Sequence, residues 1–95
     1  MNPRGAAAVH QAIAEHTTRV PRRGADTAAW IRARAEHQRQ TAALTQELVD
    51  ACHREQARPA IRQVAECAAE QARQQAWWWQ TRTQQVDVDE AGWQA

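Results

Sequence analysis

The sequence contains no lysine, phenylalanine or tyrosine, and glycine and proline occur only three times each. Leucine, isoleucine and valine together contribute only 11 of the 95 residues. So few β-branched, aromatic and turn-forming residues exclude a β-sandwich or a β-barrel. The two cysteines are too few for a disulfide scaffold. No stretch approaches the roughly 18 consecutive apolar residues of a transmembrane helix. We therefore expect an all-α protein without a membrane span.

The residues that are abundant favour helices. Alanine, glutamine, arginine and glutamate make up 54 of the 95 residues, and all four lose little side-chain freedom in a helix. The net charge is only +1, so the chain lacks the high net charge typical of disordered sequences. Because large apolar side chains are scarce, the core of an isolated chain is thin. We expect a second copy or another protein to complete it.

The sequence predicts a first helix over about residues 3–19 and a loop over residues 20–25. Asn2 is a suitable N-cap, and Pro3 suits the first helical position. Val9, Ile13, His16 and Val20 recur at helical spacing and predict the buried face. Pro21 and Gly24 break the pattern, and Asp26 is the expected N-cap of the next helix.

Between Asp26 and about residue 85 only Pro59 interrupts the helical pattern, which predicts helices over about 26–57 and 59–85. We expect a helical hairpin that turns at residues 58–60, because a short chain rarely sustains an isolated rod. The alternative is a kinked rod or coiled coil, which the lack of a glycine or asparagine before the turn favours. In the hairpin, residues equidistant from the midpoint between Pro59 and Ala60 face each other, as Cys52 and Cys67 would.

Large apolar residues at helical spacing predict the buried seam of this hairpin. The expected seam residues are Trp30, His37 (or Arg34), Thr41, Leu44, Leu48, Cys52 (or Ala51), Ile61, Val64, Ala68, Ala72 and Trp79 (or Ala76). Residues 1–85 are interpreted as a single helical domain. Residues 86–95 alternate apolar and acidic side chains and carry no base, so we expect a flexible acidic tail.

The most unusual feature of the sequence is three consecutive tryptophans. Successive helical residues are rotated by about 100°, so Trp77, Trp78 and Trp79 sweep about 200° of the helix surface. Packing on one side cannot bury all three. Tryptophan dominates binding hot spots. One interpretation is that one or two of the three fill the end of a helical bundle while the third is partly exposed. A second is an anchor surface for a partner, and a third is a belt at a membrane interface. In the second interpretation the partner-binding residues are Trp77, Trp78, Trp79 and, in the tail, Trp93.

Positive charge is concentrated in the first 40 residues. The cluster consists of Arg19, Arg22, Arg23, Arg32, Arg34 and Arg39. Three interpretations remain open: a solvated surface, a nucleic-acid contact through phosphate-binding guanidinium groups, or docking of the acidic tail.

No pattern in the sequence points to catalysis, a metal or a cofactor. The histidines and cysteines lack metal-ligand spacing, and no glycine-rich phosphate loop or nucleophile motif is present. We expect both cysteines to be small buried residues and His37 to be a hydrogen-bonded core histidine. The chain is not expected to be an enzyme or to bind a small-molecule substrate.

The length and the expected central turn are similar to those of the small helical-hairpin substrates of type VII secretion. Those proteins carry W-x-G in the turn, where this sequence has Arg58-Pro59-Ala60, so no membership is assigned. The residues instead favour a cytoplasmic helical module that interacts with itself or with another protein through its tryptophans. The alternative is an accessory protein that binds nucleic acid through the arginine cluster.

Overall fold

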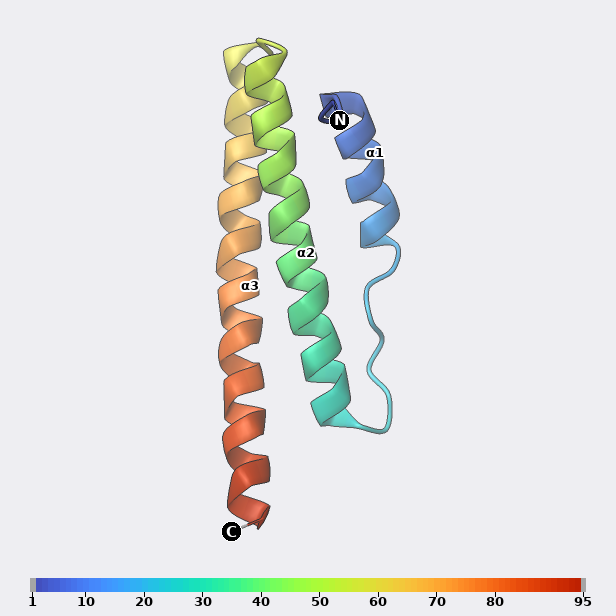
Figure 1. Ribbon diagram of the computed structural model, residues 1–95, viewed down its shortest axis with the longest axis vertical. Coiled ribbons are helices and arrows are strands. Elements are labelled where there is room, and N and C mark those ends of the chain that lie inside the picture. Colours follow the sequence, from blue (N-terminus) through green and yellow to red (C-terminus); the bar gives the residue numbers. More distant parts are fainter. Residues whose placement is uncertain (1, 95) are drawn as a thin grey trace.

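The computed structural model describes residues 2–94 and the side chains of residues 2–92. These residues form three α-helices: α1 over Ala6–Thr17, α2 over Thr27–Arg54 and α3 over Pro59–Gln94. Figure 1 shows α2 in the middle, with α1 on one side and α3 on the other. The expected all-α fold with a helical hairpin is therefore confirmed.

The helix α2 begins as the sequence predicts and ends in a way that it does not. The Asp26 carboxylate accepts a hydrogen bond of 3.0 Å from the Ala29 amide and caps the first turn. At the other end, Gln56 adopts a left-handed conformation with φ 53°, which glycine usually supplies. The Ala57 amide then donates to the Cys52 carbonyl at 2.9 Å. The first arm thus ends without a glycine.

The chain reverses over residues 55–58, slightly before the expected turn, so the kinked-rod alternative is wrong. Pro59 is the first residue of α3, where its missing amide hydrogen has no consequence. The two arms align about the expected midpoint. His53 Nε2 lies 3.1 Å from Glu66 Oε1, and these two residues are equidistant from that midpoint.

The rotation of α3 differs from the expectation. Cys52 is buried, but Cys67 is exposed, so the two cysteines do not face each other and only one is the small buried residue that we expected. The hairpin packs instead through Ala65, Ala69 and Ala72 of α3. Small side chains at these positions let the two helix backbones approach closely.

This alanine seam displaces two residues that the sequence placed in the core. Ile61 and Val64 are both exposed. Viewed along the axis of α3, Ile61 and Val64 lie about 40° and 100° around the helix from Ala65. The largest apolar residues of the first turns of α3 are therefore left outside the hairpin interface.

The helix α1 packs on α2 and is shorter than expected. It begins at Ala6 because the side chain that caps it comes from elsewhere in the fold: the Glu55 carboxylate accepts a 2.6 Å hydrogen bond from the Ala6 amide. Val9 is completely buried against the rest of the protein, whereas Val20, beyond the end of the helix, is exposed.

Two stacked histidines join α1 to α2. The His16 and His37 rings lie parallel, with centroids 3.8 Å apart. His37 Nε2 donates to the His16 carbonyl at 2.9 Å, and His16 Nε2 donates toward the His37 carbonyl at 3.0 Å and toward Thr41 Oγ1 at 2.9 Å. His37 is buried, which confirms the expected core histidine.

The expectation of a flexible acidic tail is wrong, because α3 continues through residues 86–94. The acidic residues find partners in the helical conformation. Asp87 and Glu90, almost one turn apart, both accept hydrogen bonds from Arg32 of α2, at 3.1 and 2.7 Å. These contacts fix the last turns of α3 against α2.

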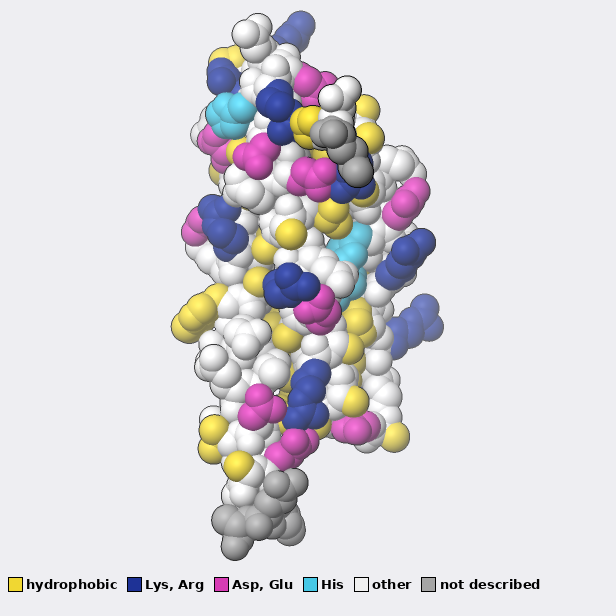
Figure 2. Space-filling view, in the orientation of Figure 1, with side chains coloured by type: hydrophobic (Ala, Val, Ile, Leu, Met, Phe, Trp, Pro, Cys, Tyr) yellow, Lys and Arg dark blue, Asp and Glu magenta, His cyan; other side chains and the backbone are white. Residues whose placement is uncertain are grey.

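The three helices form an open arrangement. Both α1 and α3 pack on α2, but among the described residues they do not pack against each other. In a closed three-helix bundle each helix contacts the other two. Here a strip of α2 remains between the two flanking helices. Figure 2 shows a face of the molecule on which arginine and acidic side chains are interspersed along the helices.

Candidate interaction surfaces

The three consecutive tryptophans have three different environments. Trp79 points into the hairpin and is 7 % exposed, whereas Trp78 is 42 % and Trp77 is 70 % exposed. The Trp79 ring packs edge-to-face on Trp30 of α2, with centroids 5.4 Å apart, and on Trp78 at 4.9 Å. One indole thus completes the core, and the other two form the surface.

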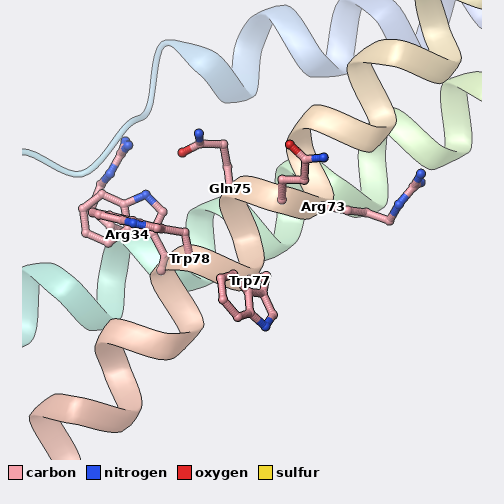
Figure 3. Close-up of a pocket in the computed structure, with 7 residues that line it drawn as sticks. Arg34, Arg73, Gln75, Trp77 and Trp78 are labelled. Carbon is pink, nitrogen blue, oxygen red and sulfur yellow. The ribbon is translucent and has the colours of Figure 1, made fainter.

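Arginines cover the faces of these indoles. The guanidinium carbon of Arg82 lies 3.9 Å from the Trp78 centroid, and that of Arg34 lies 4.8 Å from the Trp79 centroid. Such cation–π contacts hold the rings in place. In Figure 3 Trp78 extends toward Arg34, whereas Trp77 projects away from it. A shallow hollow of about 700 Å³ here is lined by Arg34, Arg73, Gln74, Gln75 and the three tryptophans.

The predicted partner-binding set is therefore brought together only in part. Trp77 and Trp78 are available on the surface, and Trp79 is a core residue. The Trp93 side chain lies outside the part of the chain that the structure describes.

The six arginines of the predicted basic cluster do not act alike. Arg32 binds Asp87 and Glu90, and Arg39 binds Glu36 within α2. The hydrogen bond from Arg39 lowers the pKa of Glu36 to about 2. Arg34 packs on Trp79, and the Arg23 guanidinium lies 5.4 Å from the Trp30 centroid.

The remaining members, Arg19 and Arg22, are exposed in the segment between α1 and α2. The acidic residues expected to dock on the cluster reach it at Arg32 alone among the described ion pairs.

A second surface was missed by the sequence analysis. An open groove of about 700 Å³ lies between α1 and α3. Its floor is formed by Thr45, Leu48 and Cys52 of α2, of which Thr45 and Cys52 are buried and Leu48 is half-buried. Its walls consist of Ala6, Ala7, His10 and Ile13 from α1 and of Ala60, Ile61, Val64, Ala65 and Ala68 from α3.

No arginine, aspartate or glutamate lines this apolar groove. Two acidic residues of α2, Glu36 and Glu47, lie about half a turn around the helix from Thr45. The signal in the sequence was the spacing of four, three and four between the alanines at 65, 69, 72 and 76. This spacing marks a second apolar stripe beside Ile61 and Val64. When the alanine stripe packs on α2, Ile61 and Val64 are left to line the groove.

The described residues contain no group of three or more histidine, cysteine or acidic side chains placed to hold a metal. No described helix is both long enough and apolar enough to cross a membrane. Comparison with known protein families, with curated proteins and with solved structures gives no match.

Proposed function

We propose that the protein is a small helical interaction module that assembles with a second copy of itself. The observation that carries this proposal is the open arrangement of the helices. Because α1 and α3 do not pack against each other, the apolar groove between them faces water in a single chain. Uncharged apolar surface of this kind is typical of protein interfaces.

The exposed area of the chain supports the same proposal. A folded monomer of 10.7 kDa is expected to expose about 5,500 Å². This chain exposes 6933 Å², an excess of roughly 1,400 Å² over that expectation. Each partner in a standard stable interface buries about 800 Å². The elongated shape of the chain, 55 × 26 × 20 Å, produces this excess, and a second copy packed along it would reduce the exposed area per chain.

The occupant could instead be a larger protein for which this module is an adaptor. The second copy is favoured because the chain itself offers matching uncharged helical surface. We place this assembly in the cytoplasm, where the two free thiols, Cys52 and Cys67, stay reduced.

The mass in solution tests the proposal. Sedimentation velocity or light scattering should give twice the chain mass of 10.7 kDa, and the thermal midpoint should fall on dilution. A monomer of 10.7 kDa at every concentration, with a midpoint independent of dilution, would overturn self-assembly.

Nucleic-acid binding is the second candidate, favoured by one observation. Among the described side chains, Arg19, Arg22, Arg23, Arg34 and Arg82 form no ion pair with an acid. Unpaired guanidinium groups beside exposed indoles suit single strands, which bind through phosphate contacts and base stacking.

Affinity for a single-stranded oligonucleotide that falls steeply with salt would support this candidate. Replacing Arg22, Arg23 and Arg34 with alanine should abolish that affinity. Arg39→Ala is the matched control, since Arg39 is already paired with Glu36. Equal loss in the control, or none in the triple variant, would exclude this site.

A further inference from the structure

We infer that the apolar groove receives α3 of the second copy, so that two chains pack face to face about a two-fold axis. This inference rests on the proposed self-assembly and names the surface that performs it. It assigns the interface to the groove and not to the exposed Trp77, which projects away from Arg34 and the hairpin (Figure 3).

One side of α3 lacks charge over five turns. The residues on this side of α3 are Ala60, Ile61, Val64, Ala68, Gln71, Gln75 and Trp78. The charged residues of the same segment are held elsewhere: Glu66 contacts His53, and Arg73 contacts Gln46 and Glu70. The uncharged side continues directly into the groove through Ile61, Val64 and Ala68.

The shape of this surface is self-complementary. Val64 is 70 % exposed and Ile61 is also exposed, so both stand out from the groove wall. The opposite wall and the floor combine the small side chains of Ala6, Ala7 and Thr45 with the larger ones of His10, Ile13 and Leu48, and the groove between the walls is open. In a two-fold interface the same surface patch is used twice, so residues 71–78 of each α3 lie over the groove wall formed by residues 61–68 of the other copy.

The uncharged stretch also fixes the register. Two antiparallel α3 helices that cross at the level of residues 69–70 bring Ile61 of one copy next to Trp78 of the other. The same alignment places Gln75 opposite Val64 and Gln71 opposite Ala68. Trp78, which is 42 % exposed in the single chain, then acquires an apolar neighbour. The Arg82 guanidinium, which covers the Trp78 ring, lies at the end of this contact.

A pair of matched substitutions tests this inference. Val64→Glu places a charge in the groove wall, and Val88→Glu places the same charge on the same helix outside the groove. The two valines are 70 % and 64 % exposed, so neither change should disturb the fold of a single chain. An unpaired charge in the interface should raise the dimer dissociation constant more than about 100-fold in Val64→Glu only.

Sedimentation velocity of the wild type, both variants and Trp77→Ala separates the outcomes, with circular dichroism to verify equal helix content. Dissociation of Val64→Glu alone supports the groove. A Val64→Glu dimer that persists, with dissociation of Trp77→Ala, overturns the groove and leaves self-assembly intact. A wild type that is monomeric throughout refutes self-assembly itself, and the inference with it.

Discussion

The two helices that pack on α2 are held in different ways. The α2–α3 contact is long and apolar, with an alanine seam at one end and the buried Trp79 at the other. The α1–α2 contact has one completely buried side chain, Val9, and the half-buried Ala6 and Ile13. It also contains several polar contacts: the stacked histidines, the Glu55 cap and the Arg4–Glu47 ion pair. The hairpin therefore has its own apolar core, whereas the docking of α1 on α2 depends strongly on the alignment of polar groups.

This difference matters for the groove, because α1 forms one of its walls. A helix of 12 residues is too short to be stable alone in water. It stays folded only while it is docked on α2. Any change that releases α1 should therefore open the groove while it spares the hairpin.

The largest expected effect concerns the apolar contact. Trp79→Ala should destabilise the protein by about 3–5 kcal/mol, because it leaves a cavity between α2 and α3 beside Trp30. The adjacent Trp77→Ala is the control and should cost less than about 0.5 kcal/mol, since Trp77 is largely exposed. Urea unfolding measures both values. Equal losses would mean that the hairpin does not depend on the buried indole.

The next largest effect tests the independence of α1. Val9→Asp places a carboxylate in the centre of the α1–α2 contact and should weaken that docking by about 2–4 kcal/mol. Hydrogen exchange should show that the amides of α1 lose protection while those of α2 and α3 keep theirs. If all three helices lose protection together, the contrast between the two contacts is not real.

The sequence predicted the three helices and the reversal at Pro59 because these features depend on local signals. Asp26 is a cap of standard type, and a proline is tolerated at the start of a helix. The sequence did not predict how α3 is rotated about its own axis, and this rotation decides which of its faces packs on α2. Helical periodicity shows that Ile61 and Ala65 belong to neighbouring stripes, but not which stripe faces α2. Because the backbones of α2 and α3 approach each other closely, the alanine stripe is the one that packs on α2.

The candidate surfaces were predicted unevenly for the same reason. The geometry of three successive helical residues requires that one or more of Trp77, Trp78 and Trp79 stay exposed, and this is observed. The groove could be predicted only from the knowledge that α1 and α3 do not pack against each other. The helical conformation of the acidic tail was not predicted, because Asp87 and Glu90 gain Arg32 as a partner only after the hairpin has formed.

The next effect in size concerns the turn of the hairpin. Gln56→Gly should stabilise the protein by about 0.5–1 kcal/mol, because glycine adopts the left-handed conformation of residue 56 without strain. Thermal unfolding measures the gain. Gln56→Ala keeps the strain and is the control. Because the change acts on the hairpin, exchange of the α1 amides relative to the hairpin should stay the same. A destabilised glycine variant would contradict the strain argument.

The smallest expected effect concerns pH and the polar contact of α1. The Arg4 guanidinium donates two hydrogen bonds to Glu47, at 2.8 and 2.7 Å, and these bonds with its charge lower the pKa of that carboxyl. A lowered pKa means that the ion pair stabilises docking fully above the ordinary glutamate pKa of 4.5. This contribution is lost as the pH falls through the lowered value.

The protection of the α1 amides, referred to those of the hairpin, should therefore decline in acid in the wild type. Both Glu47→Gln and Arg4→Gln should lower that protection at neutral pH and flatten its acid dependence. The lowered carboxyl pKa values of Glu36 and Glu70 do not compete with this effect, because each pairs with an arginine three residues along its own helix. An unchanged acid profile in Glu47→Gln would show that a group other than this carboxylate controls the release of α1.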